Sequence, residues 1–300
     1  MKIKSSDTAR TMAPQLVNGT VLAALGVLAF SLSFPGTVWS LDGFGPWTAV
    51  GLRGVIAAMA AGGALALTRA PVPKCEDRAP LVIVALGCAL GFPLLTTLAL
   101  VTTSTSHSAV VIGVLPMATA VIASIVTKRW QPPLFWLAAG LGAAVVVTFA
   151  LVQNGGGLSV GDVYLFGAVV LCAAGYAEGG RLAARLPGWQ VIAWGVVLAA
   201  PINIAVTVFG MAHEAIEPSA KALVGLAYIG LVSQFGGFVP WYRGMALVGV
   251  ARASQVQLAQ PLLTLVWAVL LLGERLTAAT PVAALIVVAC IVVTQRAKES

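Results

Sequence analysis

Two glutamines with helical spacing stand at the head of an otherwise apolar stretch, "ASQVQLAQPLLTLVWAVLLLG" (residues 253–273). Gln257 and Gln260 are three positions apart, so they share one face of a helix with Pro261. A side-chain amide both donates and accepts hydrogen bonds, which suits a zwitterionic solute. The face could therefore line a cavity, or its amides could bond to neighbouring helices and help the bundle pack. Gln255 points away from this face and is expected at the interface.

Prolines mark candidate hinges in the chain. A proline inside a helix removes one backbone donor and frees a carbonyl about one turn earlier. Pro261 and Pro116 both lie inside apolar stretches, 145 positions apart. Such a pair predicts two bends around one site, although a kink can also be purely architectural. Phe34 and Pro35 are a further candidate hinge or gate near the outer end of the first apolar stretch.

Two ionisable residues are candidate solute contacts. Arg53 lies about two turns into an apolar stretch, where it either snorkels to the interface, pairs with Asp42 or faces the carboxylate of a solute. His107 follows a run of hydroxyl residues, "TTSTS", and is either a proton relay or an interfacial residue at a helix start. Glu178 has Arg181 three residues on, which predicts a local ion pair.

Three aromatic residues complete the candidate substrate contacts. Tyr176 lies deep in an apolar stretch beside a glycine, where it could line a cavity or pack. Trp194 lies about one turn deeper than the belt of tryptophans expected at the membrane interface, and Trp241 closes another stretch.

The sequence carries no pattern typical of catalysis or of a bound metal. It lacks a Gly-x-Ser-x-Gly elbow, a His-Glu-x-x-His motif and a phosphate-binding Gly-rich loop. The four cysteines have no metal-ligand spacing, and the two histidines both lie near the same side. We expect no cofactor, no metal and no enzymatic activity, with an intramembrane lipid-modifying enzyme as the remaining catalytic alternative.

Composition places these residues in a membrane. The chain has 300 residues, of which 59% are hydrophobic and 9% charged, and its mean hydropathy is +0.98. An ordinary soluble domain carries about 25% charged residues. Alternation of apolar and polar residues with period two is absent, which argues against a barrel. The fold class is therefore an all-α membrane protein.

A scan for apolar runs predicts ten transmembrane helices. The expected spans are 16–39, 46–68, 80–100, 107–127, 132–152, 160–184, 189–211, 221–243, 249–272 and 278–295. Short connections leave no room for a soluble domain.

Basic residues orient these spans. With both termini cytoplasmic, 14 of the 17 Lys and Arg residues fall on the inner side. They are Lys2, Lys4, Arg10, Arg69, Lys74, Arg78, Lys128, Arg129, Arg181, Arg185, Arg243, Arg252, Arg296 and Lys298. The bias accounts for the net charge of +7 without a nucleic-acid partner. It predicts a multi-pass protein of a bacterial inner (plasma) membrane, in contact with membrane lipid.

The chain reads as two halves. A polar, Gly-rich seam, "QNGGGLSVGD" (residues 153–162), divides the spans into five and five. Because five is odd, the second half enters the membrane upside down relative to the first. We expect a five-helix repeat over 1–152, a linker over 153–161 and an inverted five-helix repeat over 162–300.

The closing segment "SQVQLAQPLLTLVWAVLLLGERLTAATPVAALIVVACIVV" resembles the end of the EamA-type branch of the drug/metabolite transporter superfamily. The shared features are the polar helix start, the midspan Pro261, the exit "GERLT" and a small-residue final helix. The first half carries a weaker copy with "KRW" at the exit. The resemblance implies a ten-helix carrier of small metabolites, some relatives exporting amino acids and others handling drugs.

The combined expectation is a monomeric inner-membrane transporter that exports small metabolites, foremost amino acids, by alternating access. No carboxylate is predicted to lie unpaired at mid-depth, which favours a facilitator over a proton-driven pump. A multidrug exporter of the same fold is the main alternative.

Overall fold

A computed structural model describes residues 5–128, 130–153, 156–183, 185–248 and 256–298. Over these residues the chain is helical apart from short connections and one isolated β-bridge, between Phe44 and Ile216. In chain order the elements are α1 (Ser5–Ser31), α2 (Ser33–Leu41), α3 (Pro46–Leu67), α4 (Cys75–Val84), η1 (Ala85–Gly91), α5 (Phe92–Thr102), α6 (Thr105–Ile112), α7 (Leu115–Thr127), α8 (Pro133–Gln153), α9 (Val160–Leu182), α10 (Gly188–His213), α11 (Ala220–Ala227), η2 (Tyr228–Gly236), α12 (Phe238–Val248), α14 (Ala259–Leu272) and α15 (Ala279–Lys298). The elements η1 and η2 are π-helices.

Eight segments are long and apolar enough to cross a membrane. They are Asn18–Leu41, Pro46–Leu67, Cys75–Thr102, Thr105–Val126, Pro133–Gln153, Val160–Leu182, Gly188–His213 and Ala220–Gly244. Two shorter apolar helices, Ala259–Leu272 and Ala279–Val293, follow where the last two spans are expected. The start of the ninth expected span, including Gln255, lies outside the described residues. The all-helical membrane fold is confirmed.

Helix ends follow local sequence signals. Pro46 stands at the first position of α3, where its missing N–H costs nothing. Ser159 and Asp162 form a reciprocal capping box that starts α9. Gly273 ends α14 with φ of +68°, a left-handed conformation that favours glycine.

Several spans are interrupted, and two kinds of interruption recur at the same spacing. Spans three and eight each contain a π-helical segment, and these segments end at Gly91 and Gly236, 145 positions apart. Span four breaks at Gly113, before Pro116, and the helical turn before α14 breaks at Leu258, before Pro261, again 145 positions apart. Because π-helical bulges and breaks disturb the regular hydrogen-bond ladder, they free backbone groups inside the bundle.

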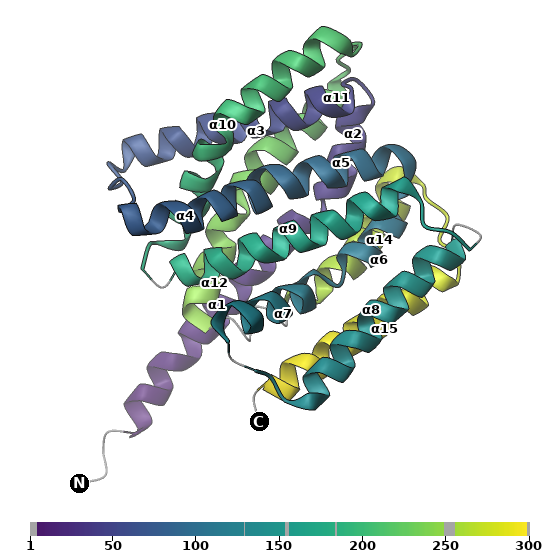
Figure 1. Ribbon diagram of the computed structural model, residues 1–300. Helices are drawn as coiled ribbons and strands as arrows, with labels where there is room; N and C mark the ends of the chain where they lie inside the picture. Colours follow the sequence, from purple (N-terminus) through teal and green to yellow (C-terminus); the bar gives the residue numbers. More distant parts are fainter. Residues whose placement is uncertain (1–4, 129, 154–155, 184, 249–255, 299–300) are drawn as a thin grey trace.

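Packing arranges the helices as a layered bundle (Figure 1). The α3–α10 pair forms one edge and the α8–α15 pair the opposite edge, with α5, α9, α6 and α14 between them. The start of α1 and the end of α15 lie at the same end of the bundle. Close approach of α3 and α10 depends on Gly54, where any side chain would clash with Asn203.

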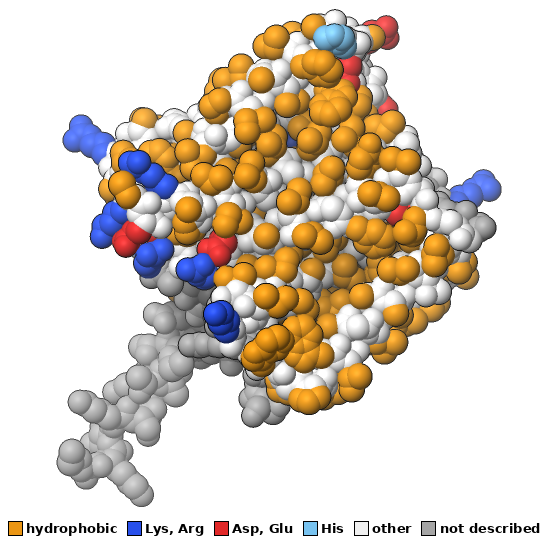
Figure 2. Space-filling model, in the orientation of Figure 1, with side chains coloured by type: hydrophobic (Ala, Val, Ile, Leu, Met, Phe, Trp, Pro, Cys, Tyr) orange, Lys and Arg blue, Asp and Glu red, His pale blue; other side chains and the backbone are white. Residues whose placement is uncertain are grey.

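The surface has the character of a lipid-facing bundle. Large apolar side chains are exposed along the helices, Leu67 and Leu137 among them, and Figure 2 shows these side chains covering the visible face. Lys and Arg side chains gather at the end where α4 begins and α9 ends. The apolar band and the basic end agree with a multi-pass membrane protein.

Candidate functional site

A cavity lies at the centre of the bundle, where the interrupted spans meet. It offers about 60 Å³ to the centre of a water-sized sphere. Its lining comes from both halves of the chain: Phe30, Ser33, Phe34, Arg53, Cys88, Phe92, Ala109, Ile112, Gly113, Leu115, Pro116, Cys172, Tyr176, Ser233, Gln234, Phe238, Gln257, Gln260, Pro261 and Thr264. We call this space the central cavity.

Arg53 is the charged group of the central cavity. Its guanidinium donates from Nε to Gln234 Oε1 (2.8 Å) and from Nη2 to Ser233 Oγ (3.1 Å). The residue is only 4% exposed, so it does not snorkel to the interface. Asp42 pairs instead with Lys221, at 2.7 Å. Among the described residues no carboxylate pairs with Arg53, so its charge has only neutral partners.

A hydrogen-bond chain joins the two π-helical segments next to Arg53. Gln234 on η2 donates from Nε2 to the carbonyl oxygen of Ala89 on η1, at 2.8 Å. The hydroxyl groups of Ser233 and Ser33 lie 2.6 Å apart, which ties η2 to α2. The carbonyl of Ala89 is available in this way because the wider turn of a π-helix leaves backbone groups without their usual partner.

The two predicted cavity glutamines do face the central cavity. Gln257 is 6% exposed and Gln260 is half-buried. Neither side chain hydrogen-bonds to any described residue. Thr264, one turn further on, donates to the carbonyl oxygen of Ser31 at 2.9 Å and so holds the break between α1 and α2. The amides of this face therefore have no partner among the described residues, while its hydroxyl is used for packing.

Aromatic rings form the apolar part of the wall. Phe30 and Phe238 lie 4.8 Å apart between ring centroids, and Tyr176 contacts Phe238 edge to face at 6.4 Å. Phe34 lines the cavity directly after the break at Leu32. Ring faces and edges of this kind can surround an apolar side chain beside the charged Arg53.

The predicted hinges divide between the cavity and its surroundings. Pro116 and Pro261 both line the central cavity, just past the two breaks. A Cβ on Gly113 would lie 3.5 Å from Pro261, so the broken helices touch at this point. Pro35 is buried in α2 without lining the cavity.

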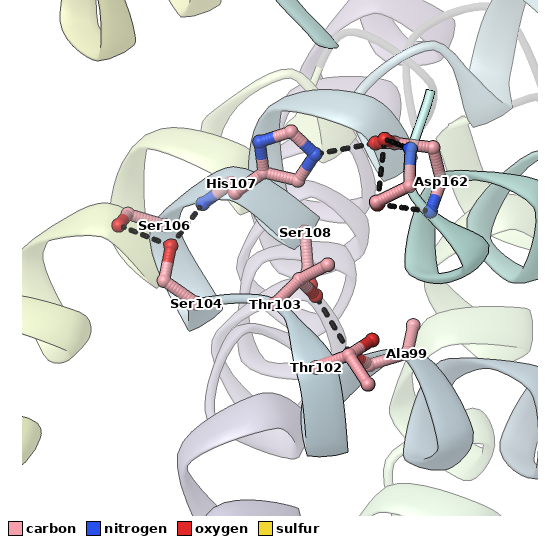
Figure 3. Close-up of polar contacts among 9 residues, drawn as sticks. Ala99, Thr102, Thr103, Ser104, Ser106, His107, Ser108 and Asp162 are labelled. Atoms are coloured by element: carbon pink, nitrogen blue, oxygen red, sulfur yellow. Dashed lines mark hydrogen bonds and ion pairs between the residues drawn. The ribbon is translucent and has the colours of Figure 1, made fainter. Parts of the chain in front are cut away.

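Three other predicted substrate contacts lie away from the central cavity. Trp241 is 4% exposed and packs edge to face against Phe30 at 6.2 Å. Trp194 is half-buried on α10, and its indole N–H has no hydrogen-bond partner in the described part of the chain. His107 is buried at the start of α6, and its Nε2 lies 2.6 Å from Asp162 Oδ1 (Figure 3).

Two carboxylates fasten the helix ends that lie opposite the basic end of the bundle. Asp162 also accepts from the backbone and hydroxyl of Ser159, so its charge is fully bonded. Glu274, from the exit motif "GERLT", accepts from the backbone N–H groups of Thr105 and Ser106 at 2.7 and 2.9 Å. The second half thereby caps the start of α6 in the first half, which gives the motif's glutamate a structural role.

Sequence reasoning misses Gln234 and Ser233. Gln234 is the amide in "YIGLVSQFGGF", an apolar setting like that of Gln257, so the same argument could have found it. The ion pair of Arg181 with Glu178 is present as expected, at 2.8 Å. Among the described residues no cluster of three or more His, Cys, Asp or Glu could hold a metal ion.

Comparisons with known proteins agree with this geometry. The chain is 39% identical over 279 residues to "Uncharacterized transporter YdeK" of Bacillus subtilis (strain 168), covering 93% of this chain and 97% of the relative. A crystal structure of a protein 18% identical in sequence superposes with a TM-score of 0.65, over 92% of this chain and 97% of that one, which supports the fold alone.

The family model described as "EamA-like transporter family" matches residues 17–151 and residues 159–295. The first range ends before the Gly-rich seam and the second begins within it, and each range contains one proline-marked break. Family and relative point to a transporter rather than an enzyme. The chain therefore belongs to the EamA-like transporter family.

Proposed function

We propose that this protein exports small zwitterionic metabolites, foremost amino acids, through the central cavity. The observation that carries the proposal is that Arg53, buried and with only neutral partners among the described residues, lines the same cavity as Gln257 and Gln260, whose amides bond to no described residue. An isolated buried charge costs several kcal/mol unless a counter-ion joins it. A solute carboxylate would supply that counter-ion, and the amides would receive its amino group.

The topology proposed for this activity has ten spans with both termini cytoplasmic. The basic end of the bundle supports the orientation, because Lys and Arg concentrate on the cytoplasmic side of bacterial membrane proteins. The recurrence of π-segments and breaks at a spacing of 145 supports two inverted repeats, 1–152 and 162–300, joined by 153–161. A relative from Bacillus subtilis is consistent with a bacterial inner (plasma) membrane.

Alternating access would use the breaks as hinges. The broken helices α6–α7 and α14 touch at Gly113 and Pro261, at the wall of the central cavity. Interrupted spans bend at less cost than continuous helices because their ladders are already open. Bending at these breaks would open the cavity first to one side of the membrane and then to the other, while Arg53 stays in its wall. A single protomer is sufficient for this movement.

We further propose a facilitator, which relaxes an existing gradient. The central cavity is lined by one cation and by no carboxylate or imidazole among the described residues. No group there is suited to exchange a proton near neutral pH.

A multidrug exporter of the same fold remains the second candidate, and the aromatic wall favours it. Phe30, Phe34, Phe92 and Phe238 could hold a flat apolar cation through ring faces. The positive charge of Arg53 argues against a multidrug exporter, because it would repel such a cation.

A substrate screen in proteoliposomes tests both candidates. Proteoliposomes that contain the purified protein are loaded with each of the twenty unlabelled amino acids in turn. Exchange against the same amino acid in radiolabelled form is measured, and uptake of a cationic dye is measured in parallel. Exchange of at least one apolar amino acid, without dye transport, is expected. Dye transport with no amino-acid exchange would refute the proposed substrate class.

A further inference from the structure

A second cavity lies at the end of the bundle opposite the basic end. It is lined by Thr102, Thr103, Ser104, Ser106, His107, Gln153, Arg275, Thr277 and Thr280. Six of these residues carry hydroxyls, and the other three carry an amide, an imidazole and a guanidinium. It offers about 210 Å³ to the centre of a water-sized sphere. We call this cavity the outer vestibule.

Arg275 is the charged side chain in the lining of the outer vestibule. The neighbouring Glu274 accepts from the backbone N–H groups of Thr105 and Ser106 and from the hydroxyl of Ser106. Arg275 itself is exposed and pairs with no carboxylate among the described residues. The vestibule therefore presents a guanidinium without a described carboxylate partner, and a guanidinium binds carboxylates through its paired N–H donors.

His107 adds a second polar group whose orientation is fixed. Its side chain is 9% exposed, stacks on Phe149 at 5.2 Å and bonds through Nε2 to Asp162. Figure 3 shows the ring held between Asp162 and the helix start, with the other ring nitrogen directed away from Asp162. That nitrogen, Nδ1, has no partner among the described residues although the residue lines the vestibule.

The outer vestibule lies next to the central cavity along one helix. His107 lines the vestibule, and Ala109, two positions on in α6, lines the central cavity. Two residues of a helix rise by about 3 Å. The two side chains point to opposite sides of the helix, so the start of α6 separates the cavities, with Arg275 in the outer one.

We propose that the outer vestibule is a second binding site, which holds the carboxylate group of a small zwitterion at the release side of the transporter. The inference rests on the proposed export function for the direction of travel. Arg275 supplies the charge. The hydroxyl pair of Thr277 and Thr280, which accepts from Gln153, has one proton left to donate. The space of about 210 Å³ admits a small zwitterion. Because the carboxylate is common to all amino acids, the site does not discriminate between side chains.

Protection of an introduced thiol tests this site independently of transport. Thr102→Cys places an exposed thiol in the vestibule without removing a proposed donor, because the Thr102 hydroxyl donates to the carbonyl of Ala99. Cys75→Ser removes the exposed native cysteine, since Cys88, Cys172 and Cys290 are buried. The full chain in nanodiscs is labelled with a polar maleimide in the presence of glycine or L-leucine. At ten times its dissociation constant a ligand should slow labelling about tenfold, because labelling follows the unoccupied fraction.

Matched variants and probes locate the effect. Arg275→Gln should abolish protection and Arg275→Lys should retain part of it. Arg53→Gln, in the central cavity, and the exposed Arg243→Gln on α12 should leave protection intact. L-leucine methyl ester, which lacks the carboxylate, should not protect.

Four results would overturn the second site: no protection by glycine or leucine, protection that survives Arg275→Gln, equal protection by the ester, or equal protection by inorganic phosphate. The last would indicate a general anion site instead of a solute site. Failure of the export proposal is distinguishable, because it would abolish amino-acid exchange while leaving protection in place.

Discussion

Two regions of the protein that bury a charged side chain treat it differently. At the end of the bundle opposite the basic end, Asp162 is completely buried and receives donors from His107 and Ser159. In the central cavity, Arg53 is nearly as buried but has only the neutral Gln234 and Ser233 as partners among the described residues. A satisfied pair holds helices together, whereas an unbalanced charge is costly unless something else balances it. The difference supports packing for the first region and, as proposed, solute binding for the second.

Removing the unbalanced charge should have the largest effect on transport. Arg53→Gln is expected to lower amino-acid exchange about 100-fold, because a hydrogen bond to a charged group contributes about 1.5–3 kcal/mol and 1.4 kcal/mol is a factor of ten. Thermal stability should not fall, since the change removes a buried charge without a counter-ion. The measurements are counterflow in proteoliposomes and a melting curve in detergent. Normal exchange together with a lowered melting temperature would make Arg53 a packing residue.

Changes to the pair of Asp162 and His107 should lower stability and leave transport unchanged. Asp162→Asn is expected to lower the free energy of unfolding by about 1–3 kcal/mol, because a charged acceptor of several hydrogen bonds becomes a weaker neutral one. The amino-acid concentration that gives half-maximal exchange should stay unchanged. Combining Asp162→Asn with His107→Gln should cost less than the sum of the two single changes, as expected for groups in contact. Strict additivity would show that the two side chains do not stabilise each other.

A smaller loss is expected from the neutral side of the central cavity. Gln257→Leu should reduce exchange about tenfold, the equivalent of one lost hydrogen bond of about 1.4 kcal/mol to the solute. Gln190 on α10 is the matched control, because it is equally buried but does not line the cavity. Gln190→Leu should leave exchange near the wild-type rate. If both variants transport alike, the amide of Gln257 does not contact the solute.

No effect is expected from removing a pH gradient. With equal pH on both sides, counterflow of an exchanged amino acid should proceed at the rate seen with a gradient, because no carboxylate or imidazole among the described residues lines the central cavity. The measurement compares initial rates with and without an imposed gradient in the same vesicles. Exchange that stops without the gradient would move attention to His107 and Asp162 as a proton-binding pair.

Much of the fold could be predicted because it depends on local patterns. Apolar runs mark the helices, since only a helix satisfies its own backbone in lipid. Pro116 and Pro261 marked the two breaks for the same local reason, a missing backbone donor. The π-helical segments η1 and η2 have no comparable signal, because they depend on how neighbouring helices pack.

The candidate site could be predicted in part. Buried amides and charges in apolar runs stand out, so Gln257, Gln260 and Arg53 were accessible to reasoning from residue type alone. His107 and Trp241 have equally distinctive types, but the structure puts one against Asp162 and the other against Phe30. Depth in a helix predicts burial and leaves open which neighbour a side chain meets.

Residue order alone establishes the membrane class, the helical content and the paired prolines, because each of these depends on the chemistry of one short segment in lipid. The folded arrangement alone supplies the partners: Gln234 of the second half holds Arg53 of the first, and Glu274 caps α6 across more than half the chain. Hydrogen bonds act over about 3 Å, while these residues are more than 160 positions apart in sequence. Only the packing of whole helices brings such groups within reach of each other.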